Sequence, residues 1–172
     1  MARPPDLSPQ PSRKRIRLPL GDYHSPGAWY FVTVCCDKKR PLLNMTERRE
    51  LVRQLLVQLA LAQKVELASY SILPDHLHFI SSAGTRGLVG FVRDFKSASA
   101  RQLRRRGFRG SLWQRSFFDH KLRNDQSLSE KSQYIWLNPV RRGLVREAKD
   151  YPWSGALREG QHQAIGRPEG QV

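Results

Sequence analysis

The sequence predicts an α+β fold, a ferredoxin-like split βαβ antiparallel sheet with helices on one face. Segments dense in β-branched and aromatic residues alternate with segments whose apolar residues recur at helical spacing. Two of the strand-like segments are joined only by Pro74 and Asp75, a tight turn that requires antiparallel pairing and disfavours an all-parallel sheet. The chain has 172 residues, enough for one domain with a core of its own.

The first half of the predicted domain holds one strand, one helix and a hairpin. Residues 28–36 (AWYFVTVCC) are typical of a buried strand. Residues 44–64 carry leucines at helical spacing, and Asn44 is the predicted cap at the start of that helix. Residues 65–73 and 76–83 form the two strands of the hairpin.

The second half holds two helices and one strand. The spacing of apolar residues over residues 87–107 predicts a strongly amphipathic helix that ends at Gly107. Its apolar stripe consists of Leu88, Phe91, Val92, Phe95 and Ser99. Residues 117–123 predict a strand. Residues 127–138 predict a helix that ends before Pro139, because the residue before a proline avoids the helical conformation.

Composition separates the domain, expected over residues 21–157, from both ends of the chain. Residues 1–20 mix prolines with basic residues and cannot bury much apolar surface, so we expect a flexible basic arm. Its basic residues include Arg13, Lys14, Arg15 and Arg17. The arm is either a solvated tail or a grip on phosphates. Residues 158–172 are expected to form a disordered tail.

The net charge indicates a polyanionic partner. Lysine and arginine total 30 against 15 acidic residues, a formal charge of +15, which favours nucleic acid and leaves an anionic membrane surface as the alternative. No apolar run reaches the length of about 20 residues that a membrane helix needs, and the start of the chain resembles no secretion signal, so we expect a cytoplasmic protein. Cys35 and Cys36 are the only cysteines, which excludes a disulfide framework and a four-thiolate zinc site.

Cations gather along and after the predicted helix at residues 87–107. Residues 86–109 contain eight basic side chains against a single acid, Asp94. Such a run is either a solvated surface or a phosphate-binding surface, and like charges repelling at a helix end favour phosphate contact. Arg104, Arg105 and Arg106 form the densest part of it.

Two pairs of polar residues suggest a chemical site. Alternate side chains of a strand share a face, so His76 and His78 project together and either chelate one metal ion or make structural hydrogen bonds. Tyr134 and Asn138 are four residues apart and share one face of the last predicted helix. Taken alone, this pattern favours a tyrosine that simply covers the core over one that belongs to a chemical site.

Four segments together resemble a known family. LPDHLHF, LWQRSFFDHKLR, QYIWLNPVRRGLV and DYPWS occur in this order over roughly residues 29–154. They closely resemble the REP-associated tyrosine transposases, a branch of the HUH-type single-tyrosine transposases, whose hallmark is histidine, a hydrophobic residue and histidine. The resemblance implies that Tyr134 is the nucleophile and that His76 and His78 bind a metal ion. Asn138 stands where relatives often place a glutamine as third metal ligand, and its side chain is shorter by one methylene.

The resemblance also implies an activity. It predicts a cytoplasmic, nucleoid-associated bacterial enzyme that cleaves and rejoins single-stranded DNA at hairpin-forming repeats through a 5′-phosphotyrosine. Two imidazoles and one amide suit Mg²⁺ or Mn²⁺. A monomer is favoured, and a dimer is possible. Residues expected to contact DNA are Arg13, Lys14, Arg15, Arg17, Arg104, Arg105, Arg106, Trp113, Arg115 and His120.

Two other functions remain open from the sequence. One is a catalytically idle DNA-binding protein derived from such a transposase, which intact His76, His78 and Tyr134 disfavour. The other is a metal-dependent hydrolase, disfavoured because no carboxylates cluster near the histidines in the sequence.

Overall fold

The computed structural model describes residues 23–123 and 125–157, and it confirms the predicted α+β class with one antiparallel sheet. The elements in chain order are β1 (Tyr30–Cys35), η2 (Asp37–Lys39), α1 (Thr46–Ala62), β2 (Leu67–Ile72), β3 (His76–Ser81), α2 (Gly87–Arg105), β4 (Phe118–Lys121), α3 (Asp125–Arg141), η3 (Ala148–Asp150) and β5 (Ser154–Leu157). The strand order in the sheet is β4-β1-β3-β2-β5. Within the described ranges, no helix has the length and apolar composition needed to cross a membrane.

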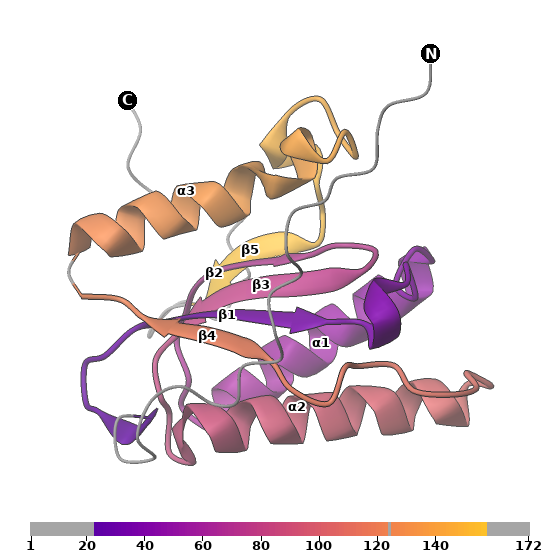
Figure 1. Cartoon of the computed structure of the whole chain (residues 1–172), viewed down its shortest axis with the longest axis horizontal. Helices are drawn as coiled ribbons and strands as arrows, with labels where there is room; N and C mark the ends of the chain where they lie inside the picture. Colours follow the sequence, from indigo (N-terminus) through magenta and orange to yellow (C-terminus); the bar gives the residue numbers. More distant parts are fainter. Residues whose placement is uncertain (1–22, 124, 158–172) are drawn as a thin grey trace, which may run out of the picture.

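The sheet is covered by helices on both faces (Figure 1). On one face Val32 and Phe79 pack into the main core with α1 and α2, while on the other Phe31 and Ile80 pack with Ile135 of α3. The prediction that the helices share one face is therefore wrong for α3. The reason is that β1 and β3 carry large apolar side chains on both faces, so each face must be shielded from water.

Two helix ends differ from their predictions. α1 begins at Thr46 with Met45 at its N-cap and no side-chain cap, so the predicted cap at Asn44 is wrong. α3 runs past Pro139 to Arg141, because the backbone N–H of Arg142 still donates to the Asn138 carbonyl over 3.0 Å. Burial of Pro139 itself and of neighbouring side chains offsets the hydrogen bond that the proline removes.

The strand β5 was missed by the sequence analysis, which predicted no helix or strand after residue 138. It has four residues and pairs antiparallel with β2 at the edge of the sheet. Gly155 allows this close pairing, because a Cβ built there would lie 2.8 Å from the Tyr70 hydroxyl. So short a strand has too little periodicity to be recognised from sequence.

The apolar stripe predicted for α2 is confirmed as part of the core. Its members Leu88, Phe91, Val92, Phe95 and Ser99 are all fully buried. The Ser99 hydroxyl donates to the Phe95 carbonyl (2.7 Å) and accepts the indole N–H of Trp113 (2.8 Å). This hydrogen-bonded chain fixes the segment after α2 against the helix.

We expect Phe91→Ala to lower the free energy of unfolding by about 3–5 kcal/mol, because it leaves a cavity beneath α2 where the ring packs on Phe79. Urea denaturation followed by circular dichroism measures the change. The control is Leu61→Ala, whose side chain is 51% exposed, and it should change the same quantity by less than about 0.5 kcal/mol. Equal effects of the two substitutions would contradict the packing described here.

Candidate active site

The imidazoles of His76 and His78 lie side by side on the face of β3 that α3 covers. Their Nε2 atoms are 3.0 Å apart, and their ring centroids are separated by 4.5 Å at an interplanar angle of 79°. Leu77, between them, points into the opposite core. The same-facing pair predicted from the strand pattern is therefore present.

The second nitrogen of each imidazole has a partner of its own. His76 Nδ1 donates to Asp75 Oδ1 over 2.8 Å, and His78 Nδ1 lies 2.8 Å from Thr33 Oγ1. Thr33 reaches His78 because the two residues are cross-strand partners in β1 and β3. Both rings are thus oriented with their Nε2 atoms converging, as in protein sites where a carboxylate or hydroxyl supports a metal-binding histidine.

Electrostatics keep one imidazole neutral and the carboxylate ionised. Burial, and then the positive charges of His76 and Arg141, lower the pKa of His78 to about 3. Burial would raise the pKa of Asp75, but the hydrogen bond from His76 and the charges of His76 and Arg142 outweigh it and lower that pKa to about 2. At neutral pH, His78 therefore offers an unprotonated nitrogen.

Tyr134 lies beside this pair in the same chain. Its ring centroid is 5.8 Å from that of His78 and 6.1 Å from that of Phe31. The guanidinium carbon of Arg141 lies 3.9 Å from the centroid of the Tyr134 ring, and Lys131 Nζ lies 5.7 Å from it. The side chain is 39% exposed, so a substrate can reach it between two cations.

Exposure distinguishes Tyr134 from the other tyrosines. The chain has five, and the structure describes all of them. Tyr23, Tyr30, Tyr70 and Tyr151 are between 0% and 4% exposed. Among the tyrosines, only Tyr134 presents its phenol to a macromolecular substrate.

Asn138 follows Tyr134 by one turn of α3, and Arg142 follows by another. Arg142 reaches Asp75 Oδ2 over 3.2 Å, while Tyr134 contacts His78. Asn138 lies between these two contacts on the same face of the helix and is only 5% exposed.

The donors fit a divalent metal ion. Two nitrogens bound to one ion at about 2.1 Å and roughly a right angle lie about 3 Å apart, which is the separation of the two Nε2 atoms. Neutral imidazoles and an amide are ligands that Mn²⁺ accepts, and that Mg²⁺ accepts when it keeps several waters. In the described part of the chain, no group of three or more His, Cys, Asp or Glu side chains is placed to hold a metal ion, and this includes the surroundings of the histidine pair.

The cations predicted to bind DNA lie away from Tyr134. Arg104, Arg105 and Arg106 are exposed at the C-terminal end of α2, on the sheet face opposite α3 (Figure 1). Arg104 and Arg115 border a cavity of about 280 Å³ beside that helix end. The structure thus separates the basic surface from the histidine pair by the thickness of the sheet.

The two regions nevertheless meet at one end of the sheet. The N–H of Cys36 donates to the Asp75 carbonyl, and the N–H of Asp37 donates to the Leu112 carbonyl, both over 2.8 Å. Leu112 lines the same cavity as Arg104. At this end of the sheet, the basic surface therefore approaches the turn that precedes His76.

Trp113 requires a correction. It was predicted to contact DNA, but its side chain is 6% exposed, its ring lies 5.8 Å from that of Phe95, and its N–H is bound by Ser99. With so little of the side chain exposed, Trp113 belongs to the core in this structure and is not a platform on which a base can stack. Trp113 lines the cavity beside the C-terminal end of α2 as a buried side chain.

The other predicted DNA contacts have mixed outcomes. His120 is exposed on β4 and pairs with Phe31, so it lies on the same sheet face as the histidine pair. Asp119, its neighbour, points to the other face and accepts a hydrogen bond from Tyr23. Arg13, Lys14, Arg15 and Arg17 lie outside the described residues, as do the predicted arm and tail.

Sequence reasoning missed several residues that support the site. These are Phe31, Thr33, Asp75, Lys131, Arg141 and Arg142. Asp75 was visible as the neighbour of His76, and Arg142 as the residue one turn after Asn138. Thr33 gave no signal, because its role depends on the pairing register of β1 and β3.

Comparisons with known proteins agree with this geometry. Residues 25–138 match the model of a family described as "Transposase IS200 like". The chain is 25% identical over 132 residues to the REP-associated tyrosine transposase of Escherichia coli K12, covering 77% of this chain and 78% of that protein. It is 29% identical over 156 residues to a Haemophilus influenzae protein provisionally given the same name, and the match covers 80% of this chain and 84% of that protein.

A solved structure shares the fold. It is that of a REP-associated tyrosine transposase bound to a REP hairpin, with a TM-score of 0.67 and 24% sequence identity. The match covers 82% of this chain and 81% of the other. At this identity the likeness concerns the arrangement of the sheet and helices.

We expect His76→Ala and His78→Ala each to weaken Mn²⁺ binding at least about tenfold, because each removes one of two converging nitrogens. Electron paramagnetic resonance of free Mn²⁺ during a titration measures the affinity. His120→Ala removes an exposed imidazole elsewhere on the same sheet face and serves as the control. Unchanged affinity in both of the first two variants would assign the pair a structural role.

Proposed function

Because the chain belongs to the IS200-like transposase family, we propose that it is a tyrosine transposase that cleaves and rejoins single-stranded DNA at hairpin-forming repeats. The observation that carries the proposal is the position of Tyr134, the exposed tyrosine, beside His78 within one chain. The named relatives are REP-associated tyrosine transposases, and the structural neighbour was solved with a REP hairpin, which supports this substrate class. The bacterial cytoplasm, at the nucleoid, is the proposed place of action.

The proposed reaction has two steps at one phosphate. The phenol oxygen of Tyr134 bonds to phosphorus while the bond from phosphorus to the 3′ oxygen breaks, leaving a 5′-phosphotyrosine and a free 3′-hydroxyl. The phenol loses its proton, and the departing 3′ oxygen gains one. A 3′-hydroxyl at another strand end then reverses the step and rejoins the DNA. The covalent link conserves the phosphodiester, so no nucleotide hydrolysis is needed.

Several side chains prepare this chemistry. Arg141 and Lys131 place positive charge beside the ring of Tyr134, where it stabilises the oxygen anion formed during attack. Held by His76, His78 and Asn138, Mg²⁺ or Mn²⁺ would supply Lewis-acid polarisation of the scissile phosphate. Asp75 and Thr33 keep the two imidazoles oriented.

DNA binding is assigned mainly to the cations of α2 and the segment after it. Arg104, Arg105, Arg106 and Arg115 are exposed and form one basic surface, suited to backbone phosphates. His120 lies on the face of Tyr134 and is proposed to contact the strand near the cleavage point. Neither contact requires base recognition.

We expect Tyr134→Phe to abolish a denaturant-resistant protein–DNA adduct, because it removes the attacking oxygen. The substrate is a hairpin oligonucleotide with single-stranded flanks, labelled at its 3′ end and incubated with Mn²⁺. A 5′-phosphotyrosine transfers this label to the protein, while a 5′ label stays on the released fragment. Denaturing gels measure both products.

The control for this substitution is Tyr151→Phe, which removes a buried hydroxyl bound to the Ile72 carbonyl and should keep the adduct. An undiminished adduct in Tyr134→Phe would overturn the assignment of the nucleophile. Tight hairpin binding by the unmodified protein without any adduct would instead favour a catalytically idle DNA-binding protein.

We expect no cleavage from a mixture of Tyr134→Phe and His76→Ala proteins, because Tyr134 lies beside the histidines of its own chain and a monomer holds a whole site. The same adduct assay measures the outcome, with each variant first checked for hairpin binding. Restored adduct in the mixture would mean that two chains share their sites.

A further inference from the structure

We propose that the ring of Phe118 stacks on the base of a nucleotide that flanks the phosphate attacked by Tyr134. The inference deepens the proposed function and rests on it, since this nucleotide belongs to the DNA strand that is cleaved. Phe118 has no part in the metal site or in the bond-breaking step described above. Its role is to hold the strand in place while Tyr134 reacts.

Phe118 stands at one end of a row of side chains that crosses the sheet through the histidine pair. Phe118 in β4 is the cross-strand partner of Thr33 in β1, and Thr33 is the partner of His78 in β3. Directly opposed side chains of antiparallel strands project to the same face of a sheet. Because neighbouring strands lie about 4.8 Å apart, the Cα atoms of Phe118 and His78 are about 10 Å apart on the face that carries Tyr134.

The exposure of its ring sets Phe118 apart from the aromatic side chains of the core. Phe118 is 37% exposed, and among the described residues Tyr134 is the only other aromatic side chain that is exposed. Phe117, its neighbour in the chain, packs against the main core on the opposite face. Single exposed apolar side chains are common, but here the two exposed aromatic rings share one face of the sheet, at the site of the proposed reaction.

The surroundings of Phe118 suit a single strand of DNA. β4 is the last strand on its side of the sheet, so the ring is open to approach from the sheet edge (Figure 1). His120 is exposed on the same face, two residues further along β4. Lys131 Nζ lies 5.5 Å from the ring centroid of Phe31, the cross-strand partner of His120. An open aromatic ring close to a cation is the combination by which proteins bind unpaired nucleotides.

The position of the ring selects the nucleotide next to the reacting phosphate. That phosphate must lie within reach of the Tyr134 oxygen and of the converging Nε2 atoms of His76 and His78. Phe118 lies two strands away from these imidazoles, a separation that a base and its sugar can span. The base must be unpaired, because a base within a duplex is already stacked on both faces.

A base held by Phe118 restricts where the phosphate can lie. In-line attack requires the phenol oxygen to approach phosphorus opposite the departing 3′ oxygen, and a misplacement of about 1 Å can cost about a hundredfold in rate. The phosphate contacts that bind the hairpin are assigned to the cations of α2, on the opposite face of the sheet. Phe118 is therefore expected to act on the rate of the covalent step more than on the affinity for the hairpin.

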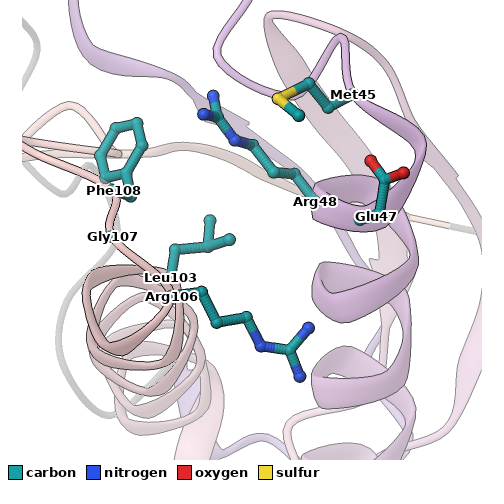
Figure 2. Close-up of a pocket in the computed structure, with 7 residues that line it drawn as sticks. All are labelled: Met45, Glu47, Arg48, Leu103, Arg106, Gly107 and Phe108. Atoms are coloured by element: carbon teal, nitrogen blue, oxygen red, sulfur yellow. The ribbon is translucent and has the colours of Figure 1, made fainter.

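Exposed apolar surface on the other face of the sheet provides a control. Figure 2 shows Met45 beside a cavity of about 210 Å³ between α1 and α2, together with Phe108 and Arg106. Met45 is 48% exposed, and α1 and α2 cover the face opposite Tyr134. A side chain in this place cannot touch a nucleotide bound at Phe118, so Met45→Ala should leave the base dependence of the covalent step unchanged.

Abasic substitution beside the cleaved phosphate tests the inference. The size of the released fragment identifies that phosphate, and the nucleotides on its two sides are replaced in turn by an abasic residue. Adduct formation with Mn²⁺ is followed under single-turnover conditions with saturating protein, and hairpin affinity is measured by fluorescence anisotropy. One of the two replacements should slow adduct formation by the unmodified protein about tenfold, within the range for loss of one stacked base.

Two substitutions of Phe118 separate the ring from the strand. Phe118→Thr removes the ring and keeps a residue that favours strands. It should slow adduct formation on the intact DNA about tenfold. The abasic replacement should then change the rate less than about twofold, because both changes remove the same contact. Phe118→Tyr keeps an aromatic ring and should retain the rate and the base dependence. Hairpin affinity should stay within about twofold in both variants, which also verifies that they are folded.

The outcomes separate this inference from the proposed function. Base dependence that is lost in Phe118→Thr and retained in Phe118→Tyr and Met45→Ala supports the stacking role. An adduct with the same base dependence in Phe118→Thr as in the unmodified protein, or with none in either, overturns that role and leaves the transposase proposal standing. Equal loss in Phe118→Tyr also overturns it. Absence of any adduct from the unmodified protein overturns the proposed function, and this inference with it.

Discussion

Asp75 lies where the candidate site is assembled, because one carboxylate is shared by the strand of the histidines and the helix of Tyr134. It accepts from His76 through one oxygen and from Arg142 through the other. Arg142 is 48% exposed, so its ion pair is screened and contributes little by itself. Apolar packing of Ile135 against Ile80 holds α3 on the sheet, and the contact of Arg142 with Asp75 links the end of that helix to the turn before His76.

The sheet divides the molecule into two surfaces with different physical character. Beneath α3, a polar row crosses four strands: Thr33 binds His78, His78 pairs with Ser71, and Ser71 accepts from Ser154 over 2.8 Å. Hydroxyls satisfy one another there, so the imidazoles sit in a buried but hydrogen-bonded setting. The opposite face is an apolar core under α1 and α2, and the cations gather at the exposed end of α2.

This division matches the demands of a DNA-processing enzyme in the IS200-like transposase family. Burial and the charges of His76 and Arg141 lower the pKa of His78 to about 3, so its nitrogen is available for a metal ion at neutral pH, while the exposed cations of α2 lie on the opposite face of the sheet, where they attract phosphates. The two surfaces meet only at the end of the sheet, through the backbone hydrogen bonds of Cys36 and Asp37.

Features that depend on local residue spacing could be predicted from the sequence. The alternation of His76 and His78, the stripe of α2 and the hairpin at Pro74 follow from the geometry of one strand or one helix, and all are present in the structure. The tertiary structure alone decided which face α3 covers, that Thr33 meets His78, that Trp113 is buried and that β5 completes the sheet. These features arise from contacts between residues far apart in the chain, where register and burial are set by packing of the whole sheet and leave no periodic trace in the sequence.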